Sequence, residues 1–228
     1  MSIMPTSDST TVVIVQSRLR TLHERVRALP ALHRLAVISR ILLALAFVPT
    51  ALVKVMGHRF SSVAASTPIG FFFEAMYQSG FYWRFLGVSQ LIAGVLLLIP
   101  ATSTLGAVLF FPIIVNIFVI TVSLQFTGTP VITGLMLLAS AFLLCWDYHR
   151  FAPMLWGSHA SYHLSPALPF PMIERVGYAI GAVGALAVLF MTRGLGTPGA
   201  LRVMAISGTA LVVLGAALVL RGWMQAQR

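Results

Sequence analysis

Apolar residues along this chain gather in six long runs, separated by shorter polar or proline-rich segments. Each run is close to the roughly 20 apolar residues that a helix needs to cross a bilayer. We therefore expect an all-α protein, a polytopic bundle of membrane-spanning helices. The expected spans are residues 35–57, 81–100, 103–125, 130–148, 175–192 and 200–221.

Composition agrees with this pattern. Hydrophobic residues make up 58% of the chain and charged residues 9%, which is far more apolar than an ordinary soluble domain. The chain is therefore expected to be an integral membrane protein with one membrane domain.

The N-terminal segment has the pattern of a surface helix. Residues 1–10 are polar and are expected to be disordered. After them, apolar residues recur at helical spacing with arginines on the flanks, which is typical of an amphipathic helix lying on a membrane. Pro30 is expected to end this helix. A short coiled-coil arm that docks on a partner is the alternative interpretation.

Two further segments interrupt the series of spans. Residues 68–80 contain three consecutive phenylalanines and Glu74, are too short to span, and are expected to form an interfacial or re-entrant helix. Prolines break up residues 149–172. The chain is thus predicted to comprise an N-terminal part with the amphipathic helix (1–34), a four-helix membrane core (35–148), and a proline-rich loop with two further spans (149–228).

The charges of the connecting segments indicate an orientation. The chain has 15 Lys and Arg against 5 Asp and Glu, and most arginines fall in the segments on one side of the membrane. By the positive-inside rule, both termini are expected in the cytoplasm, with the spans in a bacterial-type cytoplasmic (inner) membrane. Membrane lipids, including anionic lipids, are the expected partners, and nucleic acid is not.

Polar side chains within the spans indicate an interior seam, because a charge at the membrane centre costs about 3 kcal/mol. The helical rise per residue sorts these side chains into layers of similar depth. Arg40 and Asp147 share the inner layer and are expected to form an ion pair. Gln90 and Asn116 share the middle layer, where helix packing is the favoured interpretation and ligand contact the alternative.

The outer layer contains two cations at similar depth, Lys54 and Arg84. Like charges at one depth repel unless an anion lies between them. The aromatic segment that carries Glu74 is expected to fold over both cations as a lid. Two interpretations stay open. One is a headgroup site bounded by Lys54, Arg84, Glu74, Trp83 and Gln90, and the other is a closed salt bridge between Glu74 and the cations.

The block from Arg40 to Asp147 resembles the DoxX family. The resemblance is carried by the arginine that opens the first span, the lysine that closes it (ALVKVMG), the entry to the second span (FYWRFLGVSQLIAGVLLLIP) and the final Trp-Asp. It implies a DoxX-like four-helix membrane core, and some such proteins are membrane subunits of quinone-linked oxidoreductases. This chain departs from the family pattern at residues 49–51, where a glycine often precedes the lysine, and by its additional N-terminal and C-terminal helices.

Two function classes follow. The first is a membrane subunit that binds a quinone or lipid headgroup next to a redox protein partner, with Lys54 and Arg84 stabilising negative charge on the bound molecule. The alternative is a carrier or binder for an anionic lipid or small solute, with Gln90 and Asn116 lining its path. The sequence contains no recognisable self-contained catalytic or redox centre, so enzymatic activity is left open. Homo-oligomerisation is possible in either class.

Other cofactor chemistry is not expected. Haem would need axial ligands such as histidines inside the spans, and these are lacking. His159 and His163 have a spacing of four but lie in the proline-rich loop without a third ligand, so no metal is expected. The single cysteine, Cys145, cannot form an intramolecular disulfide. Gly177 and Gly181 form a small-residue face that predicts helix packing within the fold.

Overall fold

The computed structural model describes residues 7–151, 170–192 and 198–226, which form helices and contain no strand, as the sequence predicted. Six of these described helices are long and apolar enough to cross a membrane. The protein is therefore a multi-pass integral membrane protein. The helices are α1 (Ser7–Arg27), α2 (Pro30–Val55), α3 (Pro68–Gln78), α4 (Phe81–Leu98), α5 (Ser103–Ser123), α6 (Thr129–Trp146), α8 (Met172–Thr192) and α9 (Pro198–Ala226).

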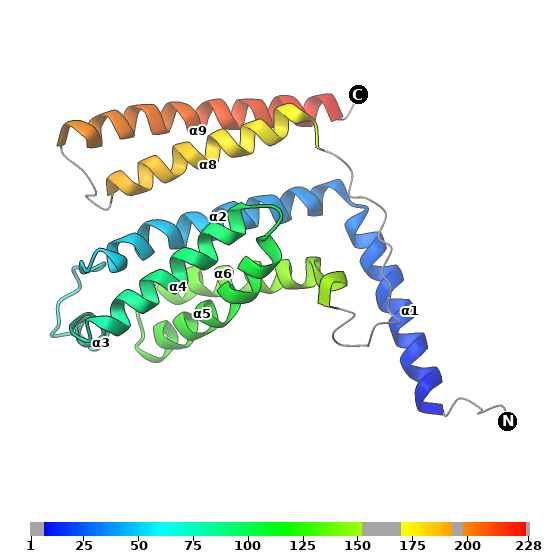
Figure 1. Cartoon of the computed structure of the whole chain (residues 1–228), viewed down its shortest axis with the longest axis horizontal. Coiled ribbons are helices and arrows are strands. Elements are labelled where there is room, and N and C mark those ends of the chain that lie inside the picture. The colour runs from blue at the N-terminus through cyan, green and yellow to red at the C-terminus, as the bar shows by residue number, and fades with distance from the viewer. Residues whose placement is uncertain (1–6, 152–169, 193–197, 227–228) are drawn as a thin grey trace.

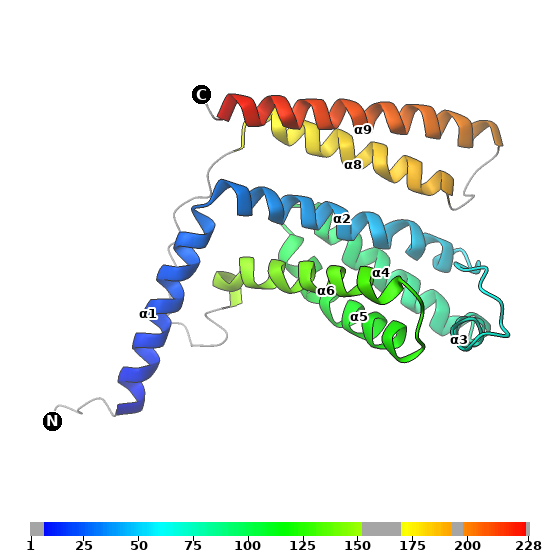
Figure 2. The same ribbon diagram turned by 180° about the vertical axis from the view of Figure 1, so that it is seen from behind.

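Helices α2, α4, α5 and α6 form a four-helix bundle in which each packs against two neighbours (Figures 1 and 2). Phe47 of α2 stacks on Phe110 of α5 across the bundle, with ring centroids 3.9 Å apart. Leu43, Ile114 and Leu143 complete the centre of this core, and each of them is at most 2% exposed. Burial of these side chains holds the four helices together in the region that also contains the polar seam.

Helices α8 and α9 form a hairpin that packs on the outer side of α2. Glycines allow its two backbones to touch. A Cβ atom at Gly184 would lie 2.6 Å from the carbonyl oxygen of Gly208, and one at Gly177 would lie 2.8 Å from that of Gly215. The glycine face predicted around Gly177 and Gly181 therefore does pack within the fold.

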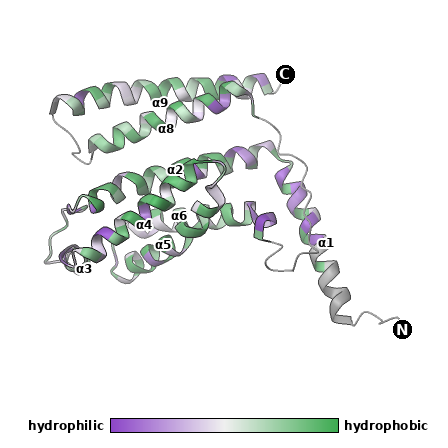
Figure 3. Ribbon diagram, in the orientation of Figure 1, coloured by the Kyte–Doolittle hydropathy of each residue, from purple (hydrophilic) through white to green (hydrophobic). Residues whose placement is uncertain are grey.

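The long helices consist largely of hydrophobic residues (Figure 3), and many of their large apolar side chains are exposed. Leu135 and Leu138 of α6 are more than 60% exposed, and Ile206 of α9 is 75% exposed. Soluble proteins rarely expose apolar patches of this extent, whereas lipid chains solvate them.

The bundle has two distinct ends, the α1 end and the α3 end, each called after the helix that lies there. At the α1 end, α1 leaves the start of α2 at a steep angle, passes the end of α6 and extends beyond the bundle (Figures 1 and 2). At the α3 end, the predicted helix of residues 68–80 is present as Pro68–Gln78 and packs on α4.

The N-terminal prediction was wrong in two respects. Residues 7–10, expected to be disordered, belong to α1, whereas residues 1–6 lie outside the described residues. Pro30 begins α2, and α1 already ends at Arg27. A proline is tolerated in the first helical turn because its missing N–H has no helical partner there. The first span consequently starts before the predicted boundary at residue 35.

Candidate functional site

Lys54 of α2 and Gln90 of α4 form a buried polar pair toward the α3 end of the bundle. The residues are 5% and 3% exposed, and Nζ of Lys54 donates a hydrogen bond to Oε1 of Gln90 at 2.8 Å. Gly87 makes this approach feasible, because a Cβ atom there would lie 2.8 Å from Cβ of Lys54. The sequence placed Lys54 and Gln90 in one site, and the structure brings them together.

Aromatic rings surround the Lys54 ammonium group. Nζ lies 4.6 Å from the ring centroid of Phe60 and 5.5 Å from that of Trp83, distances at which a cation is attracted to a ring face. Trp83 is 1% exposed and donates from its indole nitrogen to the carbonyl oxygen of His58 at 3.0 Å. That bond connects α4 to the segment after α2 and fixes the Trp83 ring beside Lys54.

Glu74 does not face the two cations of the predicted site. Its carboxylate accepts two hydrogen bonds from Arg59, at 2.7 and 2.8 Å, and a third from Gln78 at 3.1 Å. The hydrogen bonds from Arg59 and then Gln78 lower the pKa of Glu74 to about 2. The proposed counter-ion role of Glu74 toward Lys54 and Arg84 was therefore wrong. The partner that was missed, Arg59, lies in the loop before α3, where helical depth gives no guide.

Arg84 also lies apart from the buried pair. It is exposed, and its guanidinium group lies beside Gly57. Adjacent helical residues point about 100° apart, so an inward Trp83 directs Arg84 away from the interior. Arg84 does not line the cavity that lies beside Lys54, so the structure does not bring these two predicted site residues together.

A large cavity extends from the Lys54–Gln90 pair between the helices of the bundle. Its volume is about 1180 Å³, and most of the residues that line it are apolar. Asn116 of α5 also lines the cavity, although it is itself exposed. Exposed Phe85 of α4 and Leu109 of α5 belong to the wall, so the cavity opens between these helices toward the outside of the bundle.

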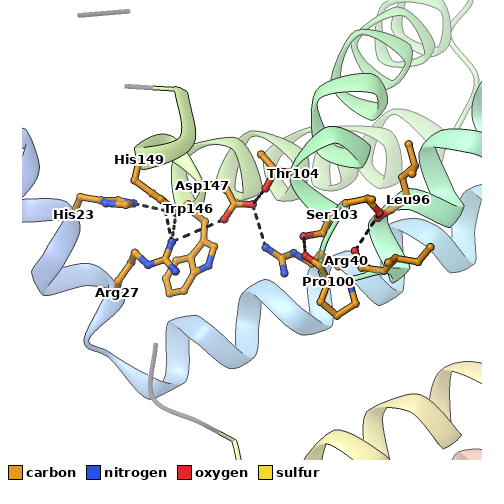
Figure 4. Close-up of polar contacts among 12 residues, drawn as sticks. His23, Arg27, Arg40, Leu96, Pro100, Ser103, Thr104, Trp146, Asp147 and His149 are labelled. Carbon is orange, nitrogen blue, oxygen red and sulfur yellow. Dashed lines mark hydrogen bonds and ion pairs between the residues drawn. The ribbon is translucent and has the colours of Figure 1, made fainter. Parts of the chain in front are cut away.

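A second polar network lies toward the α1 end and converges on Asp147 (Figure 4). Oδ2 of Asp147 accepts hydrogen bonds from Thr104 at 2.6 Å and from Arg40 at 3.2 Å. The predicted ion partners Arg40 and Asp147 thus lie together. Asp147 is 4% exposed, so the paired charge is a buried one.

The same network holds α1 against the bundle (Figure 4). Arg27 donates to the carbonyl oxygen of Trp146 at 3.1 Å and lies 3.9 Å from Oδ1 of Asp147. A ring nitrogen of His23 lies 3.0 Å from the same carbonyl oxygen, and His149 contacts Arg27 at 3.1 Å. The sequence analysis missed this contact. The end of α6 could have indicated it, because the last carbonyl groups of a helix have no N–H donor within the helix and accept hydrogen bonds from other residues.

A third network joins the hairpin to α2. Glu174 of α8 is completely buried and accepts two hydrogen bonds from Arg34, at 2.9 and 3.2 Å. Tyr178 and Trp223 donate to the same carboxylate at 3.3 and 3.1 Å. The sequence analysis missed this site too. Glu174 is one of only five acidic residues in the chain, and it needs a cation at its own depth.

The described part of the chain contains no cluster of three or more His, Cys, Asp or Glu side chains that could hold a metal ion. His159 and His163 lie outside the described residues.

These features define a class: a multi-pass membrane protein with a polar pair at one side of a large intramembrane cavity. No family model matches the chain, and no solved structure matches it. A stretch of 70 residues, 31% of this chain, is 40% identical to the protein described as "Uncharacterized protein YwoB" of Bacillus subtilis (strain 168). That stretch covers 45% of the Bacillus protein, so the chain spans less than half of this relative's length. The DoxX resemblance stays a prediction.

Proposed function

We propose that this protein is a DoxX-like membrane subunit whose four-helix core binds the headgroup of a quinone next to a redox protein partner. The observation that carries the proposal is the cavity of about 1180 Å³ with the Lys54–Gln90 pair in its wall. Its volume exceeds the roughly 300–1,000 Å³ of ordinary small-molecule pockets. A cavity of this size and apolar character suits a molecule with a long hydrocarbon tail better than a small polar solute.

The pair provides the matching chemistry for the headgroup. A lysine ammonium group donates hydrogen bonds and favours negative charge on an acceptor oxygen. In a cavity with low dielectric constant this stabilisation is stronger than in water. A quinone carbonyl oxygen beside Nζ of Lys54 would gain most from the ammonium group as negative charge develops during reduction. In this proposal the electrons come from the partner protein.

The proposal also covers the orientation of the bundle in the membrane and its contacts with lipids. The basic α1 end would face the cytoplasm of a bacterial-type cell, in agreement with the positive-inside rule. Exposed arginines of α1, such as Arg18 and Arg25, would then contact anionic lipids of the inner leaflet.

The test is photolabelling of the purified protein in lipid nanodiscs with an azido-substituted quinone, followed by peptide mapping. We expect labelling of α2 and α4, and a drop of about tenfold or more in both Lys54→Met and Gln90→Leu, since each removes a charge-assisted hydrogen bond. Arg84→Met is the matched control, because it removes a cation of similar depth outside the cavity, and it should label like the wild type.

A parallel arm with photoactivatable phosphatidylglycerol tests the alternative of an anionic lipid carrier. Labelling of the same peptides by this lipid, lost in Lys54→Met, together with no quinone labelling, would replace the quinone proposal by that alternative. Wild-type quinone labelling in both Lys54→Met and Gln90→Leu would refute the headgroup site.

A further inference from the structure

A smaller pocket lies at the α3 end, next to the large cavity. Its volume is about 190 Å³, and it contains polar groups of the loop before α3 and of α3 itself, among them Ser61 and Ser62. The Arg59–Glu74 ion pair forms part of its wall, and the Arg59 side chain is 57% exposed to the outside. Because of this polar and exposed wall, the α3-end pocket is suited to hold water.

Two aromatic side chains separate the α3-end pocket from the intramembrane cavity. Phe60 and Phe73 line both spaces, and their rings meet edge to face with centroids 4.8 Å apart. On the cavity side, Phe60 covers the Lys54 ammonium group at 4.6 Å. Trp83 also lines the α3-end pocket and lies 5.5 Å from Nζ of Lys54, so aromatic rings alone are seen between this pocket and the buried lysine.

We propose that Phe60 and Phe73 form a gate through which water and protons pass from the α3-end pocket to the Lys54–Gln90 pair. The gate gives the cavity a polar entrance, separate from the opening between α4 and α5 that faces lipid. The route follows from the geometry, whereas its use in supplying protons to a bound quinone rests on the proposed function.

Near the two rings the backbone is fixed, whereas the Phe73 side chain is held by ring contacts, and this combination suits a gate. The start of α3 is fixed, because Thr67 caps it with a hydrogen bond from the backbone N–H of Gly70 at 3.2 Å. A Cβ atom at Gly70 would lie 2.0 Å from the carbonyl oxygen of Ala64, so the loop also packs tightly there. The Phe73 side chain, in contrast, is held by ring contacts, to Phe60 and more distantly to Phe72 and Phe126 at 6.3 and 6.0 Å. A side-chain rotation opens such a contact without moving the backbone.

Cysteine accessibility tests the gate directly. In a Cys145→Ser background, Thr50→Cys places a thiol on the cavity wall, one helical turn from Lys54. Protein in phosphatidylcholine nanodiscs is treated with a negatively charged, membrane-impermeant methanethiosulfonate reagent, which reaches both aqueous faces and not the lipid. The free energy of an edge-to-face ring contact is large enough that its loss would raise the fraction of molecules with an open gate by roughly tenfold. We therefore expect Phe60→Ala and Phe73→Ala each to raise the labelling rate about tenfold.

Phe72→Ala is the matched control, since Phe72 lines the cavity and not the α3-end pocket, and it should leave the rate unchanged. Phe60→Trp, which keeps a bulky ring, should not raise the rate. The gate would be refuted if Phe60→Ala and Phe73→Ala were labelled no faster than Phe72→Ala, whether all three rates stay at the wild-type level or all three rise equally. The result is independent of the quinone, because no ligand is added. The two proposals can therefore fail separately. If the gate variants label as expected but Lys54→Met leaves quinone photolabelling unchanged, the water route is supported and only the quinone site is refuted.

Discussion

At the scale of single residues, Asp147 illustrates how a few charges organise an apolar bundle. One carboxylate, 4% exposed, lies within 4 Å of two arginines and accepts a hydrogen bond from Thr104. Burying charges is costly unless they are paired, and removing one partner leaves the others unpaired. The structural importance of such a residue is therefore larger than its number of contacts suggests.

Asp147→Asn should destabilise the folded protein by about 3–5 kcal/mol, because Arg40 loses its buried counter-ion. The measurement is the unfolding midpoint in detergent. Glu24→Gln is the matched control, since it makes the same acid-to-amide change in the exposed Arg20–Glu24 pair, where an ion pair is worth at most about 1 kcal/mol. Equal effects of the two substitutions would show that the Asp147 network does not stabilise the fold.

The sequence carried enough information to bring Arg40 and Asp147 together because both lie in regular helices, where position along the chain converts into depth. Depth alone failed at Arg84, which points about 100° around the helix from the buried Trp83 and is exposed. It also failed at Glu74, because its partner Arg59 is brought back by an irregular loop. The cavity was beyond prediction, since it depends on how the side chains of five helices pack.

At the scale of elements, α1 is attached to the bundle through its last turns, where Val26 packs against the hydrophobic core and His23 and Arg27 make polar contacts with the end of α6. His149 belongs to this group of polar contacts and contacts Arg27. Burial, and then the positive charge of Arg27, lower the pKa of His149 from 6.5 to about 4, while Asp147 opposes this shift.

The docking of α1 should weaken as the pH falls. Because the pKa of His149 is lower in the folded chain, its contribution to stability is complete above pH 6.5 and is lost as the pH falls toward about 4. Amide hydrogen exchange of α1, corrected for the intrinsic pH dependence, should therefore increase over this interval. His149→Gln should remove most of the pH dependence, whereas His58→Gln, an exposed histidine at the other end, should retain it. An equal pH response in His149→Gln and the wild type would contradict this role.

Element boundaries were predictable where apolar runs end at polar turns. The second and third spans, predicted at 81–100 and 103–125, are observed as Phe81–Leu98 and Ser103–Ser123. Pro30 was misjudged because a proline is compatible with the end of one helix and with the first turn of the next. The pattern alone does not distinguish these two positions.

At the scale of the whole molecule, the α8–α9 hairpin is an attachment to the four-helix core. Among the described helices it packs chiefly against α2, and the Arg34–Glu174 pair lies at this junction. The core contains the cavity and both of the other polar networks. Loss of the pair should therefore loosen the hairpin while leaving the core intact.

Glu174→Gln and Arg34→Gln should each destabilise the attachment of the hairpin by about 3 kcal/mol, because the remaining partner keeps its position without its counter-charge or hydrogen bonds. Hydrogen exchange should rise in α8 and α9 and stay at the wild-type level in α4, α5 and α6. Arg175→Gln is the control, since Arg175 is the exposed neighbour of Glu174 and carries the same charge as Arg34. Faster exchange throughout α4, α5 and α6 in Glu174→Gln would instead mean that the hairpin and the core unfold as one cooperative unit.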